Sequence, residues 1–287
     1  MQESVMKAWW DSSHMAGANA AYVEELYETY LEDPQSVSEN WRQIFDNLPK
    51  VDGVELETNH TTIKNSTVGL LVDGNQDDSS KLEITNTQIY NSSNFGVFGR
   101  ATSISAENLV INKSGQSSFA ATFGGNYNVV HSTIANYWTN SFRQFPALLL
   151  NNFSVDSDQN IIPNALISAN FTNCIIYGND NPELLLDPIP DAGFDFKFKN
   201  CLIYFNDPNN NFSGPYYNFE DLNFYENLFF NMNPEFLDPQ QNKLQIPLSS
   251  PAASKGISVG ELNTDITGAP RSSPSDLGAY NATDFEN

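Results

Sequence analysis

The sequence predicts a mainly β protein, a parallel β-helix solenoid with a short N-terminal α-helical arm. A short phrase recurs along the chain, and its clearest copies are Asn173–Asn179 and Asn200–Tyr204. The central isoleucines recur at intervals of 26, 22, 23, 42 and 27 residues: Ile63, Ile89, Ile111, Ile134, Ile176 and Ile203. A period of this size is typical of solenoids. Short β-branched runs between Asn, Gly and Ser corners predict strands, and stacked units of strands form a parallel β-helix.

Residues 1–52 have a helical period instead. Val23, Leu26, Tyr27 and Tyr30 have the spacing of one helix face, and Asp33-Pro34 is a stop signal. A second short helix follows. Two short helices cannot bury so many aromatic side chains alone, so their apolar faces must dock on something else. The predicted docking face comprises Val23, Leu26, Tyr27, Tyr30, Trp41 and Phe45. The alternative is that these helices cap one end of the solenoid.

Several short motifs in this segment carry a family resemblance. They are Lys7-Ala8-Trp9, Asp11-Ser12-Ser13, Gly17-Ala18-Asn19, Leu31-Glu32-Asp33-Pro34, Trp41-Arg42 and Leu48-Pro49. The segment resembles the N-terminus of the E1 component of bacterial 2-oxoglutarate dehydrogenase. The resemblance implies a non-catalytic arm that binds the E2 core of that complex through residues 1–50. Nothing after Gly53 resembles the thiamine-diphosphate domains of E1, so the resemblance implies neither dehydrogenase activity nor that cofactor.

Residues 53–206 are predicted to form the stacked coils. Inward isoleucines should stack at strand spacing, and asparagines should follow them at a turn, where Asn tolerates left-handed backbone conformations. These asparagines are Asn65, Asn91, Asn112, Asn136 and Asn179. Cys174 and Cys201 occupy the same place in two copies of the phrase. Free buried thiols are favoured, and a disulfide is the alternative.

Two segments break the period, residues 147–165 and 179–195, and the interval of 42 residues leaves room for two turns of the solenoid or for one turn plus an insertion. Both are predicted to protrude as loops, where binding surfaces usually lie. They hold the candidate catalytic carboxylates Asp156, Asp158, Asp191 and Asp195, with Asp187 beside the second pair. Paired carboxylates could hydrolyse a glycan, and Asp clusters could bind calcium. The alternative is that these acids are simply solvated. The two cysteines and three scattered histidines make no zinc constellation, so no metal site is predicted.

Residues 207–287 are predicted to form an irregular C-terminal cap that covers the last coil. The order Pro234-Glu235-Phe236, Ser250-Pro251-Ala252, Asp265–Gly268 and Asp276–Tyr280 resembles the end of secreted right-handed β-helix repeat proteins of Bacteroidetes type. The resemblance covers residues 54–281. It implies a right-handed helix and an exported or cell-surface protein, of a type in which some members bind or cleave polysaccharide.

Composition excludes some partners. A formal net charge of −22 argues against nucleic acid and anionic membranes. No apolar run is long enough to span a membrane, and no signal peptide is visible. As written, the chain therefore reads as cytoplasmic, whereas the β-helix resemblance implies export. A junction near Val51–Val54 between two unrelated halves would explain the conflict.

Three hypotheses follow. The first is a non-catalytic β-helix module, for binding or structure, that carries an E1-like docking arm. The second is a polysaccharide lyase or glycoside hydrolase with a carboxylate site on a loop. The third is an accessory part of the 2-oxoglutarate dehydrogenase complex that binds E2 without thiamine-diphosphate chemistry.

Overall fold

The computed structural model describes residues 35–37, 42, 56–74 and 81–285. The predicted helical arm lies outside this part of the chain, apart from residues 35–37 and 42. Within the described residues the strands form a ten-stranded and a seven-stranded sheet, both parallel, and one antiparallel hairpin. The prediction of a mainly β protein with parallel pairing is therefore confirmed. No helix among the described residues has the length and apolar character needed to cross a membrane.

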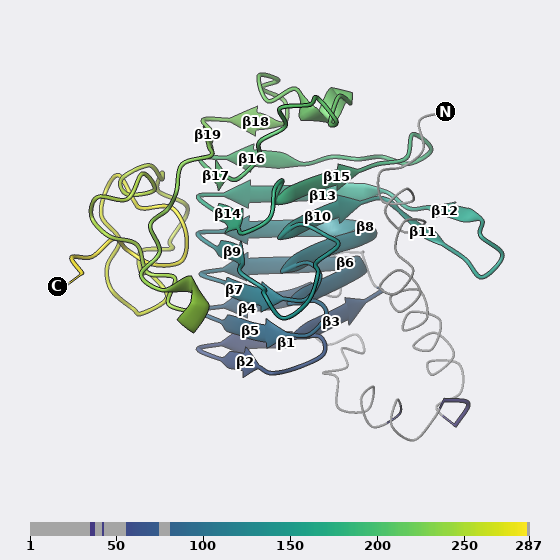
Figure 1. Cartoon of the computed structure of the whole chain (residues 1–287), viewed down its shortest axis with the longest axis horizontal. Coiled ribbons are helices and arrows are strands. Elements are labelled where there is room, and N and C mark those ends of the chain that lie inside the picture. Colours follow the sequence, from purple (N-terminus) through teal and green to yellow (C-terminus); the bar gives the residue numbers. More distant parts are fainter. Residues whose placement is uncertain (1–34, 38–41, 43–55, 75–80, 286–287) are drawn as a thin grey trace.

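The larger sheet has two limbs (Figure 1). The first limb contains β1 (Leu56–Asn59), β4 (Lys81–Thr85), the second part of β6 (Val97–Glu107), the second part of β8 (Phe119–Val130), β13 (Leu166–Thr172), β16 (Lys197–Lys199) and β18 (Tyr225–Glu226). The second limb contains β3 (Leu70–Asp73), the first parts of β6 and β8, β10 (Leu148–Asn151) and β15 (Leu184–Asp187). The register shifts between Arg100 and Thr102, where Ala101 has a positive φ of 45°, so β6 runs from one limb into the other.

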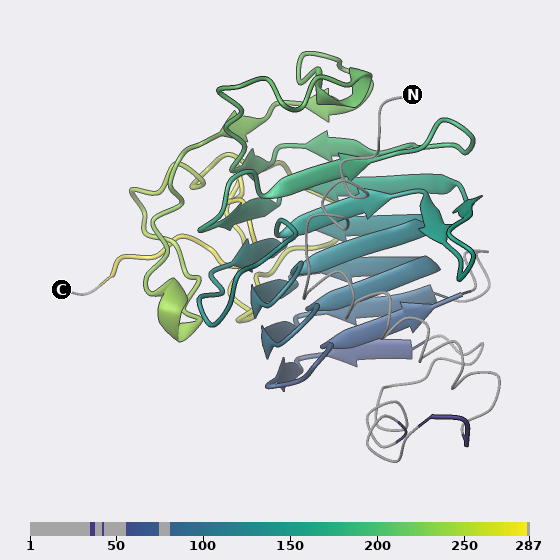
Figure 2. The same cartoon turned by 45° about the vertical axis from the view of Figure 1, so that its right-hand side comes forward.

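The smaller sheet receives the next strand after each strand of the first limb. It comprises β2 (Thr62–Lys64), β5 (Gln88–Ser92), β7 (Val110–Ser114), β9 (Thr133–Asn136), β14 (Ile175–Gly178), β17 (Leu202–Ile203) and β19 (Phe229–Phe230). The chain thus passes repeatedly through the first limb, the smaller sheet and the second limb. We call one such passage a repeat. Figures 1 and 2 show these repeats stacked in chain order.

The register of the smaller sheet confirms the predicted isoleucine ladder. Ile63 pairs with Ile89, and Ile89 with Ile111. Ile111 then pairs with Ile134, Ile134 with Ile176, and Ile176 with Ile203. The interval of 42 residues therefore separates neighbouring strands, and the extra residues form an insertion rather than a further smaller-sheet strand.

The corner between the first limb and the smaller sheet is built from asparagine. Asn86, Asn108, Asn173 and Asn200 begin copies of the phrase and have positive φ values, as does His131 in the same place. Asn tolerates this left-handed region better than most residues. The Asn108 amide donates to Asn86 Oδ1 at 2.9 Å, which links two repeats. The predicted ladder is partly displaced: Asn65 and Asn91 have positive φ and share a side-chain hydrogen bond at 3.2 Å, whereas Asn112 pairs in register with Tyr90 and Asn136 with Gly178.

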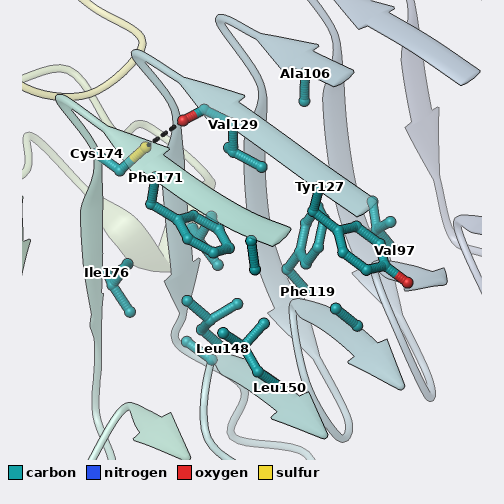
Figure 3. Packing of buried hydrophobic residues seen from close by; sticks show 14 of the residues in the cluster. Val97, Ala106, Phe119, Tyr127, Val129, Leu148, Leu150, Phe171, Cys174 and Ile176 are labelled. Atoms are coloured by element: carbon teal, nitrogen blue, oxygen red, sulfur yellow. Dashed lines mark hydrogen bonds between the residues drawn. The ribbon is translucent and has the colours of Figure 1, made fainter. Parts of the chain in front are cut away.

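The core fills the space between the two sheets (Figure 3). Inward residues of both sheets contribute to one apolar cluster, including Phe119, Phe171, Leu148, Leu150 and Ile176. Phe171 and Phe198 stack with their ring centres 5.0 Å apart, one repeat above the other. Cys174 and Cys201 are buried free thiols, which confirms the favoured alternative over a disulfide.

Parts of both predicted loops are core strands. Leu148–Asn151 pairs residue by residue with Leu184–Asp187, and both runs belong to the second limb. Leu148, Leu150, Leu184 and Leu186 point inward and are buried. The prediction of two protruding loops is wrong for these runs, because an apolar run bounded by Asn or Asp suits a buried strand. What protrudes is the hairpin of β11 (Phe153–Val155) and β12 (Ile161–Pro163) (Figure 1).

The C-terminal 80 or so residues divide into two parts. Aromatic residues around η1 (Pro215–Tyr217), with β18 and β19, pack on the last repeats, as the predicted cap requires. The following segment, which includes η2 (Pro239–Gln241), lies along the outer face of the smaller sheet instead (Figure 1). Its buried residues include Phe236, Leu244, Ile246, Ala252, Ile266, Leu277, Ala279 and Tyr280. They contact outward residues from five successive strands: Tyr90, Val110, Ala135, Ile175 and Leu202.

Candidate functional site

The hairpin between β11 and β12 carries Asp156 and Asp158. Asp156 Oδ1 accepts the backbone N–H groups of Asp158 at 2.9 Å and Asn160 at 2.7 Å, and Oδ2 accepts the Asn160 side-chain amide at 3.0 Å. The hydrogen bond from the Asn160 side chain lowers the pKa of Asp156. A general acid needs a pKa raised toward neutrality, so this carboxylate suits a turn better than proton donation. Asp158 is exposed at the tip.

The second predicted set is split between two environments. Asp187 ends β15 and is only 3% exposed. Asp191 and Asp195 are exposed on the connection from β15 to β16. The structure therefore separates Asp187, in a buried setting, from its two solvated neighbours. The predicted docking residues Val23, Leu26, Tyr27, Tyr30, Trp41 and Phe45 lie outside the described residues.

A polar row lies on the outward side of the second limb, and four of its five members are buried: Arg100, Thr122, Asn151 and Asp187. Asp73 pairs in register with Arg100, and Arg100 with Thr122. Asn151 pairs with Asp187 at the other end of the row. Arg100 Nη1 lies 3.5 Å from Asp73 Oδ2, and the Phe123 N–H donates to Asn151 Oδ1 at 2.7 Å. The row joins one acid, one base, a hydroxyl, an amide and a second acid.

The spacing of Asp73 and Arg100 in the sequence indicates this row. The two residues are one repeat apart, so they occupy equivalent positions in neighbouring strands. As the only carboxylates of the row, Asp73 and Asp187 are four strand spacings of about 4.8 Å apart, about 19 Å, which exceeds the roughly 5–9.5 Å between paired glycosidase carboxylates.

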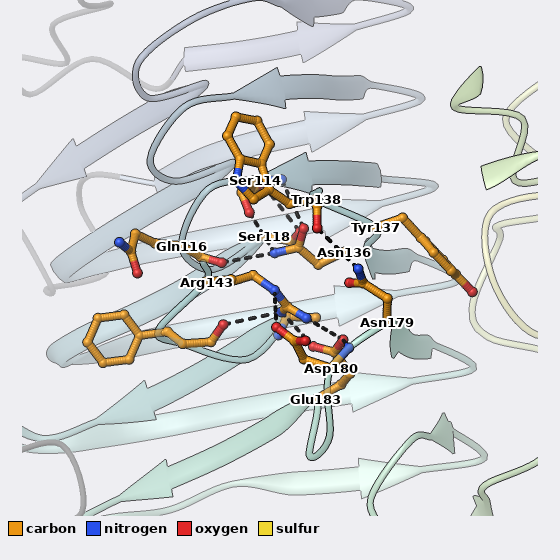
Figure 4. A network of polar contacts seen from close by, with 12 residues as sticks. Ser114, Gln116, Ser118, Asn136, Tyr137, Trp138, Arg143, Asn179, Asp180 and Glu183 are labelled. Carbon is orange, nitrogen blue, oxygen red and sulfur yellow. Dashed lines mark hydrogen bonds and ion pairs between the residues drawn. The ribbon is translucent and has the colours of Figure 1, made fainter. Parts of the chain in front are cut away.

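A buried ionic network anchors the insertion between β9 and β10 (Figure 4). Arg143 Nη1 and Nη2 donate to the two carboxylate oxygens of Glu183 at 2.7 and 2.6 Å, and Arg143 Nε lies 3.0 Å from Asp180 Oδ2. The N–H groups of Ala147 and Asp180 also donate to Glu183. Burial raises the pKa of Glu183, and the hydrogen bonds from Arg143 oppose that rise. Every Glu183 oxygen is occupied, so this network fixes the loop rather than presenting an acid.

The corner residue His131 is also structural. Its side chain is buried, and its Nε2 accepts from the Asn173 side-chain amide, 2.9 Å away. Asn173 bonds in turn to both the N–H and the carbonyl of Ile257 in the C-terminal segment. Burial, reinforced by the charge of Arg271, lowers the pKa of His131 to about 3. A neutral histidine therefore takes the place of Asn in this repeat, as its position in the phrase suggested.

Metal-binding side chains are dispersed. Across residues 56–74 and 81–285, no three of His, Cys, Asp and Glu come together in a way that could hold a metal ion. The acidic run after Asp73 enters residues 75–80, outside the described part of the chain. The absence of a metal site therefore stays a prediction, with calcium binding by the Asp clusters as its alternative.

Comparison with known proteins assigns the N-terminal segment. A family model for the 2-oxoglutarate dehydrogenase N-terminus matches residues 12–52. The 2-oxoglutarate dehydrogenase E1 component of Azotobacter vinelandii is 48% identical over 68 residues, which is 24% of this chain and 7% of that protein. The E1 component of Haemophilus influenzae is 49% identical over 63 residues, 22% of this chain and 6% of that protein. The chain thus spans less than a tenth of the length of these relatives.

Proposed function

We propose that this protein is a non-catalytic β-helix module that carries a docking arm of the kind found in 2-oxoglutarate dehydrogenase E1. Residues 1–52 form the arm, residues 53–206 the coils of a right-handed parallel β-helix, and residues 207–287 its C-terminal cover. The observation that carries this proposal is the match of residues 12–52 to the E1 N-terminus, at about half identity to two E1 proteins. The partner implied is the E2 core of that complex, reached from the cytoplasm.

The solenoid part of the proposal is supported by the register. Each smaller-sheet strand from β5 to β17 pairs in parallel with the equivalent strand of the repeats before and after it. Nearest-neighbour stacking of this kind gives a rigid body. A rigid body attached to a docking arm would place a non-catalytic surface on the complex.

Co-sedimentation with purified E2 core tests the arm. We expect the full chain to pellet with E2, and a variant lacking residues 1–50 to stay in the supernatant. Leu26→Asp with Tyr30→Asp should have the same effect, because charges on the predicted apolar face prevent its burial. A matched double substitution of exposed residues in the C-terminal segment, Glu261→Gln with Thr283→Ser, should leave binding unchanged. Absence of co-sedimentation by the intact chain would rule the docking role out.

Polysaccharide binding or cleavage is the second candidate, and it rests on the resemblance of residues 54–281 to β-helix repeat proteins. Affinity electrophoresis in gels containing neutral or acidic glycans tests binding, and an intact chain that is not retarded by any of them would rule binding out. Glycan turnover lost in the Asp156→Asn, Asp158→Asn double variant would instead establish the hydrolase or lyase alternative.

A further inference from the structure

The outer surface of the first limb, which we call the open face, differs from the other outer surfaces. One row of outward residues follows the printed strand register from β4 to β16: Glu83, Ser105, Asn128, Asn170 and Lys197. Glu83, Asn128 and Asn170 are exposed, and Ser105 and Lys197 are half-buried. This face is therefore polar and accessible along five repeats.

Charge on the open face is ordered along the stack. The acids Glu57 and Glu83 occupy the first two places, three neutral side chains follow, and Lys197 comes after them. A neighbouring row passes through Thr85, Glu107, Val130, Thr172 and Lys199, and Glu226 follows as a second acid. Lys199 is paired with Glu226 at 2.8 Å, whereas the Lys197 ammonium donates to the backbone carbonyl of Leu222 and lies two residues after the exposed Asp195.

The order of charges along this row is complementary to the same order read in the opposite direction. In a two-fold dimer the same patch is used by both copies. If the two stacks run antiparallel about a two-fold axis at Asn128, Glu83 of each copy faces Lys197 of the other, and Asn128 faces its own equivalent. Parallel stacks related by an axis along this row would instead place Glu83 on Glu83 and Lys197 on Lys197, which like-charge repulsion disfavours.

The neutral centre of the face also suits a second copy. The chain carries a formal charge of −22, so two copies repel each other over most of their surfaces. Asn126, Asn128, Ser168 and Asn170 carry no charge, and their amides and hydroxyls can both donate and accept hydrogen bonds. Association through this face brings the two acidic molecules together where the repulsion is smallest.

We propose that the protein forms an antiparallel two-fold dimer through the open face, with Glu83 of each copy paired to Lys197 of the other. The interface is polar. It limits the assembly to two copies, because each copy uses the same patch for the contact. This inference concerns a face distinct from the N-terminal arm and from the polar row of the second limb, so it stands or falls independently of the proposed function.

Charge reversal with sedimentation velocity over a roughly hundredfold dilution series tests the dimer. Glu83→Lys alone and Lys197→Glu alone should each raise the dimer Kd at least about tenfold, since each change creates two repulsive contacts by symmetry. The double variant Glu83→Lys, Lys197→Glu should restore the Kd of the original chain. Within one copy the two positions are about 19 Å apart, beyond the screening length of about 8 Å, so rescue can only arise between copies.

Glu261→Lys is the matched control, because Glu261 is exposed in the C-terminal segment and away from this face. It should leave the Kd near that of the original chain. Circular dichroism and thermal melting of each variant show that the fold is retained. A chain that stays monomeric at every concentration, or a dimer that the single reversals do not weaken, would overturn the proposal. Single reversals that weaken the dimer without rescue in the double variant would overturn the antiparallel arrangement.

Discussion

The outer face of the smaller sheet and the open face of the first limb are built on the same repeats but meet different surroundings. On the smaller sheet the outward residues are apolar, as at Val110, Ala135 and Ile175, and the C-terminal segment covers them. On the open face the equivalent places hold mostly Ser, Asn, Thr, Glu and Lys, with Val130 as an apolar exception. Inward residues stack the repeats in both cases. Outward residues decide whether a face is covered by the chain or left accessible. Outward residues can therefore be substituted on either face without altering how the repeats stack.

Two isoleucines allow a direct test of this difference. Ile175 is buried beneath the C-terminal segment, and Gly278 of that segment packs on its side chain. Ile167 lies on β13 and is 49% exposed. We expect Ile175→Asp to cost at least about 4 kcal/mol of unfolding free energy, because it buries an unpaired charge, and Ile167→Asp to cost less than about 1 kcal/mol. Urea unfolding followed by circular dichroism measures both. Equal costs would show that the cover contributes little.

The Arg143–Glu183 pair extends the comparison to buried charge. Glu183→Gln should destabilise the chain by about 3–5 kcal/mol, because it leaves the buried Arg143 guanidinium without its main counter-charge. Asp180→Asn is the matched change at the solvated partner, and it should cost less than about 1 kcal/mol. Urea midpoints of the two variants give the answer. A large loss in Asp180→Asn and a small loss in Glu183→Gln would reverse the assigned roles.

His131, beneath the C-terminal segment, makes the stability of the fold depend on pH. Its pKa is about 3 in the folded chain, against about 6.5 when unfolded, so the unfolded chain binds more protons between these values. Stability from this group is fully present above pH 6.5 and is lost as the pH falls. The loss from pH 6.5 to 5 should be about 2 kcal/mol.

His131→Asn places the residue type of the neighbouring repeats at this corner and removes the titrating group. The difference in unfolding free energy between the original chain and this variant should therefore change by about 2 kcal/mol across that pH range. Denaturant titrations of both proteins at the two pH values measure it. Parallel pH dependences would show that His131 titrates normally in the folded chain.

The smallest expected effect concerns the thiols. Burial raises the pKa of Cys174, with a further contribution from Cys201, so the reactive thiolate form is disfavoured. Both sulfur atoms are also buried, which keeps reagents away from them. We expect no thiol to react with a disulfide reagent in native buffer, and both to react in denaturant. The absorbance of the thiol released from the reagent, followed over time, measures the reaction. Rapid labelling of the native protein would indicate that the repeats around β14 and β17 open readily.

The isoleucine ladder was predictable because one aliphatic side chain per repeat must meet its equivalent in the next. The charged row from Asp73 to Asp187 was harder to find, since its members differ in type and only their spacing relates them. The runs Leu148–Leu150 and Leu184–Leu186 are predicted as loops because they match each other and not the recurring phrase, so the phrase alone does not mark them as strands. The path of the C-terminal segment could not be predicted, because its short apolar groups, such as Leu277 and Ala279, carry no period.

That path has a consequence for how the molecule unfolds. In a simple array of repeats each unit depends on its immediate neighbours, so one end can fray while the other persists. Here a single strip of chain touches Tyr90 near the start of the stack and Leu202 near its end. Losing either end therefore loosens contacts shared with every repeat between them. The strip makes unfolding more nearly all-or-none than the stacked architecture alone would allow.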